Sequence, residues 1–130
     1  MGVRYIWDTN IAIYYLQQQL PENAELFIDD LVKNDPPFIS AMTEIELLCW
    51  KNSTEENIVV IRNFIESSMI LDLDAAIKTK TVEIRKAHKI KLPDAIIAAS
   101  ALVYDLTLLT RNIKDFQAIE TLKLINPWEE

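Results

Sequence analysis

Residues 92–112, LPDAIIAASALVYDLTLLTRN, contain the signals of a helix, a strand and a polar turn in direct succession. Pro93 stands where a helix can begin, because proline is tolerated in the first helical turn, and the residues that follow it to about Tyr104 are almost all apolar. A helix without a polar side has no face to offer to water, so we expect it to lie deep in the protein. The run Thr107–Thr110 then predicts a buried strand that ends in polar residues.

Short strands and helices alternate along the rest of the chain. Apolar runs predict strands at Val3–Trp7, Phe38–Ser40, Met69–Leu73 and, as a short fifth strand, Leu122–Ile125. Helical spacing predicts helices at Ile11–Leu20, at Glu22–Lys33, through Ile45, Leu48 and Cys49, from Ser53 onward, and at Ala75–Lys89. Because such alternation produces parallel sheets covered on both faces, we expect one three-layer α/β/α domain over residues 1–130, with four or five mostly parallel strands.

The spacing also predicts which side chains of two of these helices face the core. They are Leu26, Phe27, Leu31 and Val32 in the helix at 22–33, and Ile58, Ile61 and Ile65, with Phe64 as a further candidate, in the helix from Ser53.

The composition excludes several classes of protein. Half of the 130 residues are hydrophobic and a quarter are charged, which is typical of a globular domain. A single glycine leaves no glycine-rich phosphate loop, and Cys49 alone allows neither a disulfide framework nor a thiolate metal site. The longest apolar run, Ala95–Val103, is too short to cross a membrane, and no cationic leader is present, so we expect a cytoplasmic protein.

The net charge of −7 is unevenly distributed along the chain. Residues 1–74 carry 13 acidic and 4 basic side chains, whereas residues 75–130 carry 7 acidic and 9 basic ones. The basic excess gathers in Lys78, Lys80, Arg85, Lys86, Lys89 and Lys91. This segment either contacts a polyanion or forms a solvated helix face.

Acidic and polar side chains follow three of the predicted strands. They are Asp8, the segment Ser40–Glu46 and the segment Thr110–Asp115, and ligands of parallel sheets bind beyond the carboxyl ends of the strands. Asp94, at the start of the apolar helix, is a further candidate. Taken singly, Asp8 and Asp94 also fit helix capping. Glu44 and Glu46 project about 200 degrees apart on a helix, so only one of them faces the site.

Three carboxylates brought together in a cleft repel one another and raise each other's pKa. They all stay ionised only if a cation lies between them, and ligands that are all oxygen atoms favour Mg²⁺ or Mn²⁺ over zinc. Such an ion activates water and stabilises charge on phosphate oxygens.

Four blocks of sequence resemble the signature blocks of PIN-domain nucleases, in the order and spacing of VapC-type toxins. They are Asp8-Thr9-Asn10, Ile39-Ser40-Ala41-Met42-Thr43 with Glu46-Leu47, Leu92–Ala99, and Leu109-Thr110-Arg111-Asn112 with Asp115-Phe116, and the closing Asn126-Pro127-Trp128 is similar to some members. The resemblance implies that Asp8, Glu46 and Asp94 bind the metal, with Thr9, Asn10, Thr43 and Thr110 in support. Where the family commonly has a fourth acid, this chain has Asn112, and Asp115 either supplies the missing charge or caps a helix.

By the same resemblance, the protein is an endoribonuclease that depends on Mg²⁺ or Mn²⁺, forms a homodimer and is neutralised by a VapB-type antitoxin. The candidates for contacting RNA phosphates are Arg85, Lys86, Lys89, Lys91 and Arg111. We interpret His88 as a surface residue of the basic stretch, and Trp7, Trp50 and Trp128 as core or interface residues. Candidate patches for partner contacts are Tyr14, Tyr15 and Leu16, and Leu47, Leu48 and Trp50.

Three other functions compete with this hypothesis. A degenerate PIN domain that only binds RNA or protein would explain Asn112. A receiver domain would need paired acids after the first strand, where Asp8 stands alone. A haloacid-type phosphatase would need a second aspartate where this chain has Asn10. The last two alternatives fit poorly.

Overall fold

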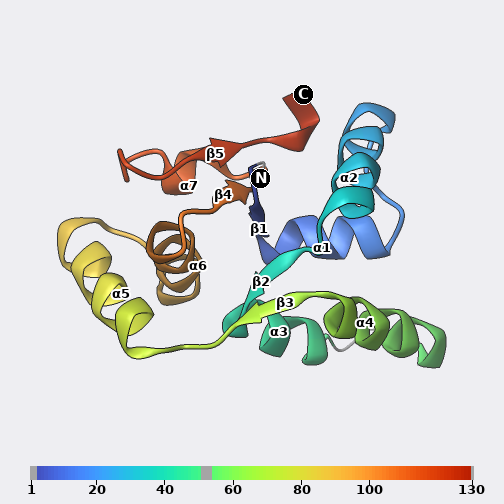
Figure 1. The fold of residues 1–130 in the computed structure, drawn as a ribbon, viewed down its shortest axis with the longest axis horizontal. Helices are drawn as coiled ribbons and strands as arrows, with labels where there is room; N and C mark the ends of the chain where they lie inside the picture. The colour runs from blue at the N-terminus through green and yellow to red at the C-terminus, as the bar shows by residue number, and fades with distance from the viewer. Residues whose placement is uncertain (1–2, 51–53, 130) are drawn as a thin grey trace.

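The computed structural model describes residues 3–50 and 54–129, and a sheet of five short strands forms its centre (Figure 1). The strands are β1 (Tyr5–Trp7), β2 (Phe38–Ser40), β3 (Met69–Leu71), β4 (Thr107–Leu109) and β5 (Leu124–Ile125). They lie in the order β3-β2-β1-β4-β5, and every neighbouring pair is parallel. The predicted parallel sheet is confirmed, with β1 in the middle.

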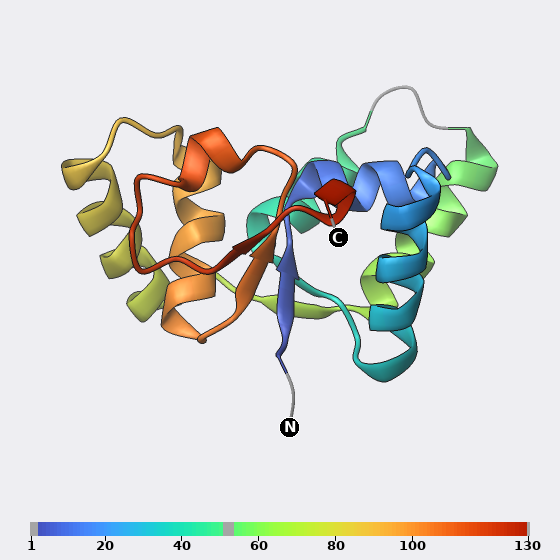
Figure 2. The same cartoon turned by 90° about the horizontal axis from the view of Figure 1, so that it is seen from above.

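Helices cover both faces of the sheet, as Figure 2 shows. In the described part of the chain they are α1 (Thr9–Leu16), α2 (Glu22–Asn34), α3 (Ala41–Leu48), α4 (Glu55–Ser67), α5 (Ala75–Ala87), α6 (Leu92–Val103), α7 (Ile113–Phe116) and a 3₁₀ helix, η1 (Pro127–Glu129). In Figure 2, α5, α6 and α7 lie on one side of the sheet and α1, α2 and α4 on the other. No helix within residues 3–50 and 54–129 has both the length and the apolar character needed to span a bilayer.

The two faces of the sheet bury two separate apolar clusters. Along β1, Ile6 points into the cluster under α5 and α6, whereas Trp7 points into the cluster under α1 and α4. Leu108 and Leu109 of β4 divide in the same way. This alternation follows from the two-residue period of a strand and produces the three layers.

Helix α6 is the most deeply placed helix, as its composition predicted. Every residue from Ala95 to Ala101 is buried, and the only hydroxyl in that run, on Ser100, donates to the carbonyl of Ile96 at 2.8 Å. Its many alanines let the backbone of α6 lie close to its neighbours. Asp94, one residue before this buried run, is therefore held firmly at the edge of the core.

Some predicted details are wrong. Val3 is exposed and outside β1, β3 ends at Leu71, and α1 ends at Leu16. Two side chains assigned to the core face solvent: Leu26 is 65% exposed and Ile58 is 41% exposed. In α2 the large buried side chain is Ile28, which was not predicted, whereas in α4 the predicted Ile61 and Phe64 are buried. Ser53 lies outside the described residues, and α4 begins after Thr54, whose hydroxyl caps it.

Candidate active site

Asp8 stands at the carboxyl end of the central strand β1 and is only 5% exposed. Its backbone N–H donates to the carbonyl of Leu109 at 2.9 Å, which continues the pairing of β1 with β4. The Thr110 hydroxyl, just beyond β4, donates to Asp8 Oδ2 at 2.8 Å. Although Asp8 occupies the cap position of α1, its carboxylate is directed at Thr110, so capping does not explain its burial.

Burial raises the pKa of Asp8 to about 6. The charges of Asp94 and Glu46 add to this rise, and the hydrogen bond from Thr110 opposes it because that bond stabilises the ionised form. Asp8 is thus a carboxylate that gives up its proton only near neutral pH.

A chain of hydroxyl groups leads to Glu46. Thr9 Oγ1 donates to Glu46 Oε1 at 2.8 Å and lies 2.9 Å from Thr43 Oγ1, and Ser40 Oγ donates to Thr43 Oγ1 at 3.2 Å. Each hydroxyl has one proton, and that of Thr9 is committed to Glu46, so Thr43 must donate to Thr9. The protons therefore all point from Ser40 through Thr43 and Thr9 to the carboxylate, an arrangement that we call the hydroxyl relay.

The hydroxyl relay distinguishes between the two glutamates of α3. Glu46 is tied to Thr9, next to Asp8, whereas Glu44 stands in the first turn of α3, about half a helical turn away around the axis. Ser40 was not singled out as a supporting residue by the sequence. It caps α3 through Thr43 N at 3.0 Å, and the Ser-x-x-Thr spacing was the available signal.

Asp94 lies in the first turn of α6 and is half-buried. Burial raises its pKa, the charges of Asp115 and Glu46 raise it further, and Lys91 opposes them. Together with the shift of Asp8, this places Glu46 near both Asp8 and Asp94, and Asp115 near Asp94. The structure therefore brings the predicted acids to one edge of the sheet.

At the fourth sequence block, Asn112 and Asp115 do different things. The Asn112 backbone N–H donates to Thr110 Oγ1 at 3.0 Å, and this exposed residue precedes the short helix α7. Asp115, within α7, is the residue whose charge reaches Asp94. Asn10 is exposed in α1, on the turn that follows Thr9.

The side-chain oxygens at this edge are suited to a divalent cation, but they do not enclose one by themselves. Within residues 3–50 and 54–129, no three acidic, histidine or cysteine side chains lie close enough to enclose a metal ion as the structure stands. The donor atoms are carboxylate oxygens, and the pKa values of Asp8 and Asp94 are raised first by burial and then by the charges of neighbouring acids, both of which a bound cation would offset. The residues therefore fit a hard ion whose shell is completed by water.

The predicted phosphate contacts separate into two groups. Arg85, Lys89 and Lys91 line a cleft together with Asp94 and Asp115, and His88 lines the same cleft. Lys86 is exposed on α5 and is not part of that lining.

Arg111 lies elsewhere. Its guanidinium group stacks 4.8 Å from the ring centroid of Trp128 and 6.0 Å from that of Tyr14. Of the tryptophans, Trp7 is a core residue, and Trp128 packs against Tyr14, as we interpreted them. Leu47, placed in a surface patch by the sequence, is buried, whereas its neighbour Leu48 is exposed.

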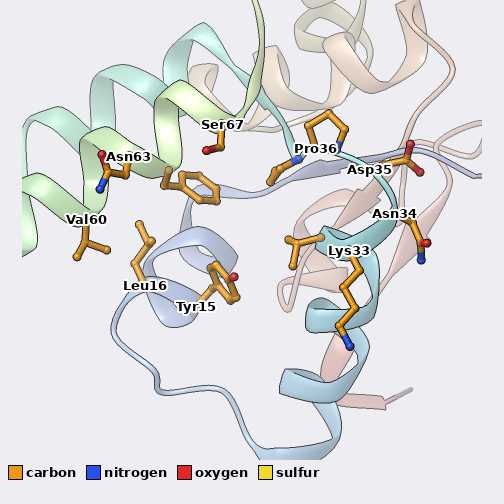
Figure 3. Close-up of a pocket in the computed structure, with 12 residues that line it drawn as sticks. Tyr15, Leu16, Lys33, Asn34, Asp35, Pro36, Val60, Asn63 and Ser67 are labelled. Atoms are coloured by element: carbon orange, nitrogen blue, oxygen red, sulfur yellow. The ribbon is translucent and has the colours of Figure 1, made fainter.

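An apolar groove of about 610 Å³ lies between α1, α4 and the end of α2 (Figure 3). Figure 3 shows Leu16 of α1 beside Val60 of α4, with Lys33 and Asn34 at the end of α2 on the opposite side. Pro36 and Pro37, just before β2, form its floor with Phe64. The groove therefore lies toward the amino ends of the strands, away from the acidic edge.

Comparison with known proteins agrees with this architecture. A family model described as the PIN domain matches residues 5–122. Ribonuclease VapC2 of Rickettsia felis is 30% identical and aligns over 97% of this chain and 98% of its own. The tRNA(fMet)-specific endonuclease VapC of Shigella flexneri is 27% identical over 93% and 96%. A solved toxin–antitoxin complex from Klebsiella pneumoniae matches with a TM-score of 0.76 at 29% identity over 95% and 97%.

These matches confirm the resemblance drawn from the four sequence blocks. The family model includes Asp8, Glu46, Asp94 and Asp115, and the two relatives align along almost the whole chain. The protein therefore belongs to the PIN-domain family, as a member of the VapC type.

Proposed function

We propose that this protein is an endoribonuclease that hydrolyses phosphodiester bonds of RNA and acts as the toxin of a toxin–antitoxin pair. The observation that carries the proposal is the buried Asp8 carboxylate, which lies within electrostatic range of Asp94 and Glu46 at the carboxyl edge of the sheet. The reaction class is supported by relatives named as a ribonuclease and an endonuclease.

In this proposal the cofactor is Mg²⁺ or Mn²⁺, held by Asp8, Glu46 and Asp94. Asp115 contributes a further negative charge beside Asp94. Such an ion supplies an activated water and positive charge against the phosphate oxygens.

The side chains around the three acids orient them for this task. Thr110 is fixed from two sides, because its hydroxyl accepts from Asn112 N at 3.0 Å and donates to Asp8 Oδ2 at 2.8 Å. The hydroxyl relay fixes Glu46 through Oε1. Both Asp8 and Glu46 are thus held by hydroxyl donors, which fix the orientation of the carboxylates that would bind a cation.

The test is cleavage of a structured RNA by the purified chain, with Mg²⁺, with Mn²⁺ and with EDTA, alongside Asp8→Asn. We expect cleavage with either ion, none in EDTA, and a loss of at least about 100-fold in Asp8→Asn, the size typical of losing an essential catalytic group. RNA binding by the wild type without cleavage under any of these conditions would favour the degenerate binding module. Equal cleavage by Asp8→Asn would contradict the proposed site.

The antitoxin in this proposal is a VapB-type protein, and its apolar helix binds in the groove between α1, α2 and α4. The lining is mainly apolar, with Leu16, Val32, Val60 and Phe64 among its residues. The part of the chain that forms the groove is acidic, since residues 1–74 carry 13 acidic and 4 basic side chains. Burial raises the pKa of Tyr15 in the groove lining, and the nearby charge of Asp29 raises it further. The fitting partner is therefore an amphipathic helix flanked by basic residues.

A second copy of the chain is the proposed partner of a different apolar face. Ile45 and Leu48 of α3 are each 55% exposed, next to an apolar hollow of about 130 Å³ between α3, β3 and α6. Replacing Leu48 by lysine puts a charge into this face, and we expect sedimentation to shift from dimer to monomer. A wild-type chain that sediments as a monomer at micromolar concentration would contradict this part of the proposal.

A further inference from the structure

A basic cleft opens beside the acidic edge of the sheet. It has a volume of about 710 Å³ and is formed by the end of α5, the link to α6 and the region around α7. Its charged lining residues are Arg85, Lys89, Lys91, Lys114, Asp94 and Asp115, and His88 lies among them. Lys114 was not among the sequence candidates for contacting phosphate.

The cations of this cleft are available to a ligand. Within the described parts of the chain, the ion pairs join Lys80 to Glu83 and Lys123 to Asp105, and neither pair involves the cleft. Arg85, Lys89, Lys91 and Lys114 are all exposed. In a protein of net charge −7, four such cations on one concave surface form a local attractor for anions.

The cleft is continuous with the candidate active site. Asp94 and Asp115 belong to its lining, and the charge of Lys91 lowers the pKa of Asp94 against the effects that raise it. An anion held by the cations therefore lies next to the acids where cleavage is proposed.

We propose that this basic cleft binds the sugar–phosphate backbone of RNA on one side of the bond that is cut. The inference rests on the proposed ribonuclease function and assigns the position of its substrate. The described lining residues include no Phe, Tyr or Trp ring, and the imidazole of His88 is their one aromatic group beside four cations. The cleft therefore contacts mainly the backbone and contributes affinity rather than sequence preference. An acidic segment of a protein partner would satisfy the same cations, but only the RNA strand must also reach the acids.

The experiment measures binding of a fluorescein-labelled single-stranded RNA by anisotropy in EDTA, at several salt concentrations. The cleft variant is Lys89→Ala/Lys114→Ala. The matched control is Lys78→Ala/Lys86→Ala, which removes the same charge from exposed positions of α5 outside the cleft. Thermal unfolding of both variants checks that they fold like the wild type.

We expect the cleft variant to bind RNA at least about tenfold more weakly near 100 mM salt. The slope of log K against log salt should fall by about 1.4, since each phosphate that a lysine no longer neutralises lowers it by roughly 0.7. The control should stay within about twofold of the wild type, because neither Lys78 nor Lys86 lines the cleft and both side chains are exposed to screening by salt.

Equal weakening of RNA binding in the two variants would overturn the inference, because general charge would then explain the binding. It would also be overturned if RNA affinity stayed unchanged in the cleft variant while affinity for an acidic peptide fell. If the wild type cleaves RNA and the cleft variant keeps both its affinity and its KM, this inference alone fails. If the wild type cleaves no RNA, the proposed ribonuclease function fails, and the inference that rests on it fails too.

Discussion

The hydroxyl of Thr9 donates a 2.8 Å hydrogen bond to the carboxylate of Glu46, which lies 37 positions further along the chain. This bond joins the end of β1 to α3, and it is the last link of the hydroxyl relay. A carboxylate held in this way keeps one orientation before any ligand arrives. Substitutions in the hydroxyl relay can show whether the fixed orientation of Glu46 matters for activity, for stability or for both.

Thr43→Val should destabilise the protein by about 1–3 kcal/mol, because Thr43 is fully buried and valine leaves Ser40 and Thr9 without their partner. The matched control is Thr81→Val, since Thr81 is also buried but bonds only the carbonyl of Ile77 in its own helix. Urea unfolding measures both. We further expect kcat to fall with little change in KM in Thr43→Val, and Thr43→Ser to restore it. Equal kcat values for Thr43→Val and Thr81→Val would show that the hydroxyl relay contributes to stability alone.

Glu46→Gln and Glu44→Gln remove the same charge from the same helix. Glu46→Gln should lower kcat/KM for RNA by about 100-fold or more, the range expected for a group that acts at the reacting centre. Glu44→Gln should stay within about twofold, because Glu44 is outside the hydroxyl relay. A larger loss of activity in Glu44→Gln would assign the site to the other face of α3.

Asp8→Asn should stabilise the protein in EDTA at pH 7.5. Burial raises the pKa of Asp8 from an ordinary 3.8 to about 6, so the folded state binds the Asp8 proton more tightly than the unfolded state does. The Asp8 contribution to the unfolding free energy therefore falls as pH rises from about 4 to 6, and the penalty is fully present above that range. It amounts to at most about 3 kcal/mol, at 1.36 kcal/mol for each unit. Unfolding of wild type and Asp8→Asn at pH 4 and pH 7.5 should give a difference that appears only at the higher pH, and a difference of the same size at both values would contradict the assignment.

Val60→Asp should abolish antitoxin binding while leaving RNA cleavage unchanged, because it introduces a charge into the groove of Figure 3, remote from the acidic edge. Val59→Asp is the control: Val59 is its exposed neighbour in α4 and is not part of the groove lining. Titration calorimetry with the antitoxin measures binding. Equal affinities of the two variants would place the antitoxin elsewhere.

The sequence allowed the layers and the position of the acids to be predicted, because both follow from local patterns. An all-apolar helix must be buried, short apolar strands separated by helices pair in parallel, and polar residues after such strands meet at one edge. Asp8, Asp94 and one of the two glutamates of α3 could thus be brought together from the sequence, and the resemblance to PIN-domain nucleases selected Glu46.

What could not be predicted depends on contacts between distant segments. Ile58 has the right spacing for the core, but its exposure depends on where α3 and β3 leave α4 uncovered. The stacking of Arg111 could not be predicted, because the sequence does not show that the chain returns to place Trp128 beside its guanidinium group. Lys114 belongs to α7, a helix of four residues that is too short to give a periodic signal.

The place of β4 in the sheet has a consequence for biosynthesis. Asp8 leaves the ribosome early, but its backbone partner Leu109 and its hydroxyl partner Thr110 are made about a hundred residues later. A growing polypeptide therefore has no finished acidic edge until translation has passed Thr110. Chains terminated before Leu109 lack both partners, so the acidic edge forms only after this later segment has been synthesised.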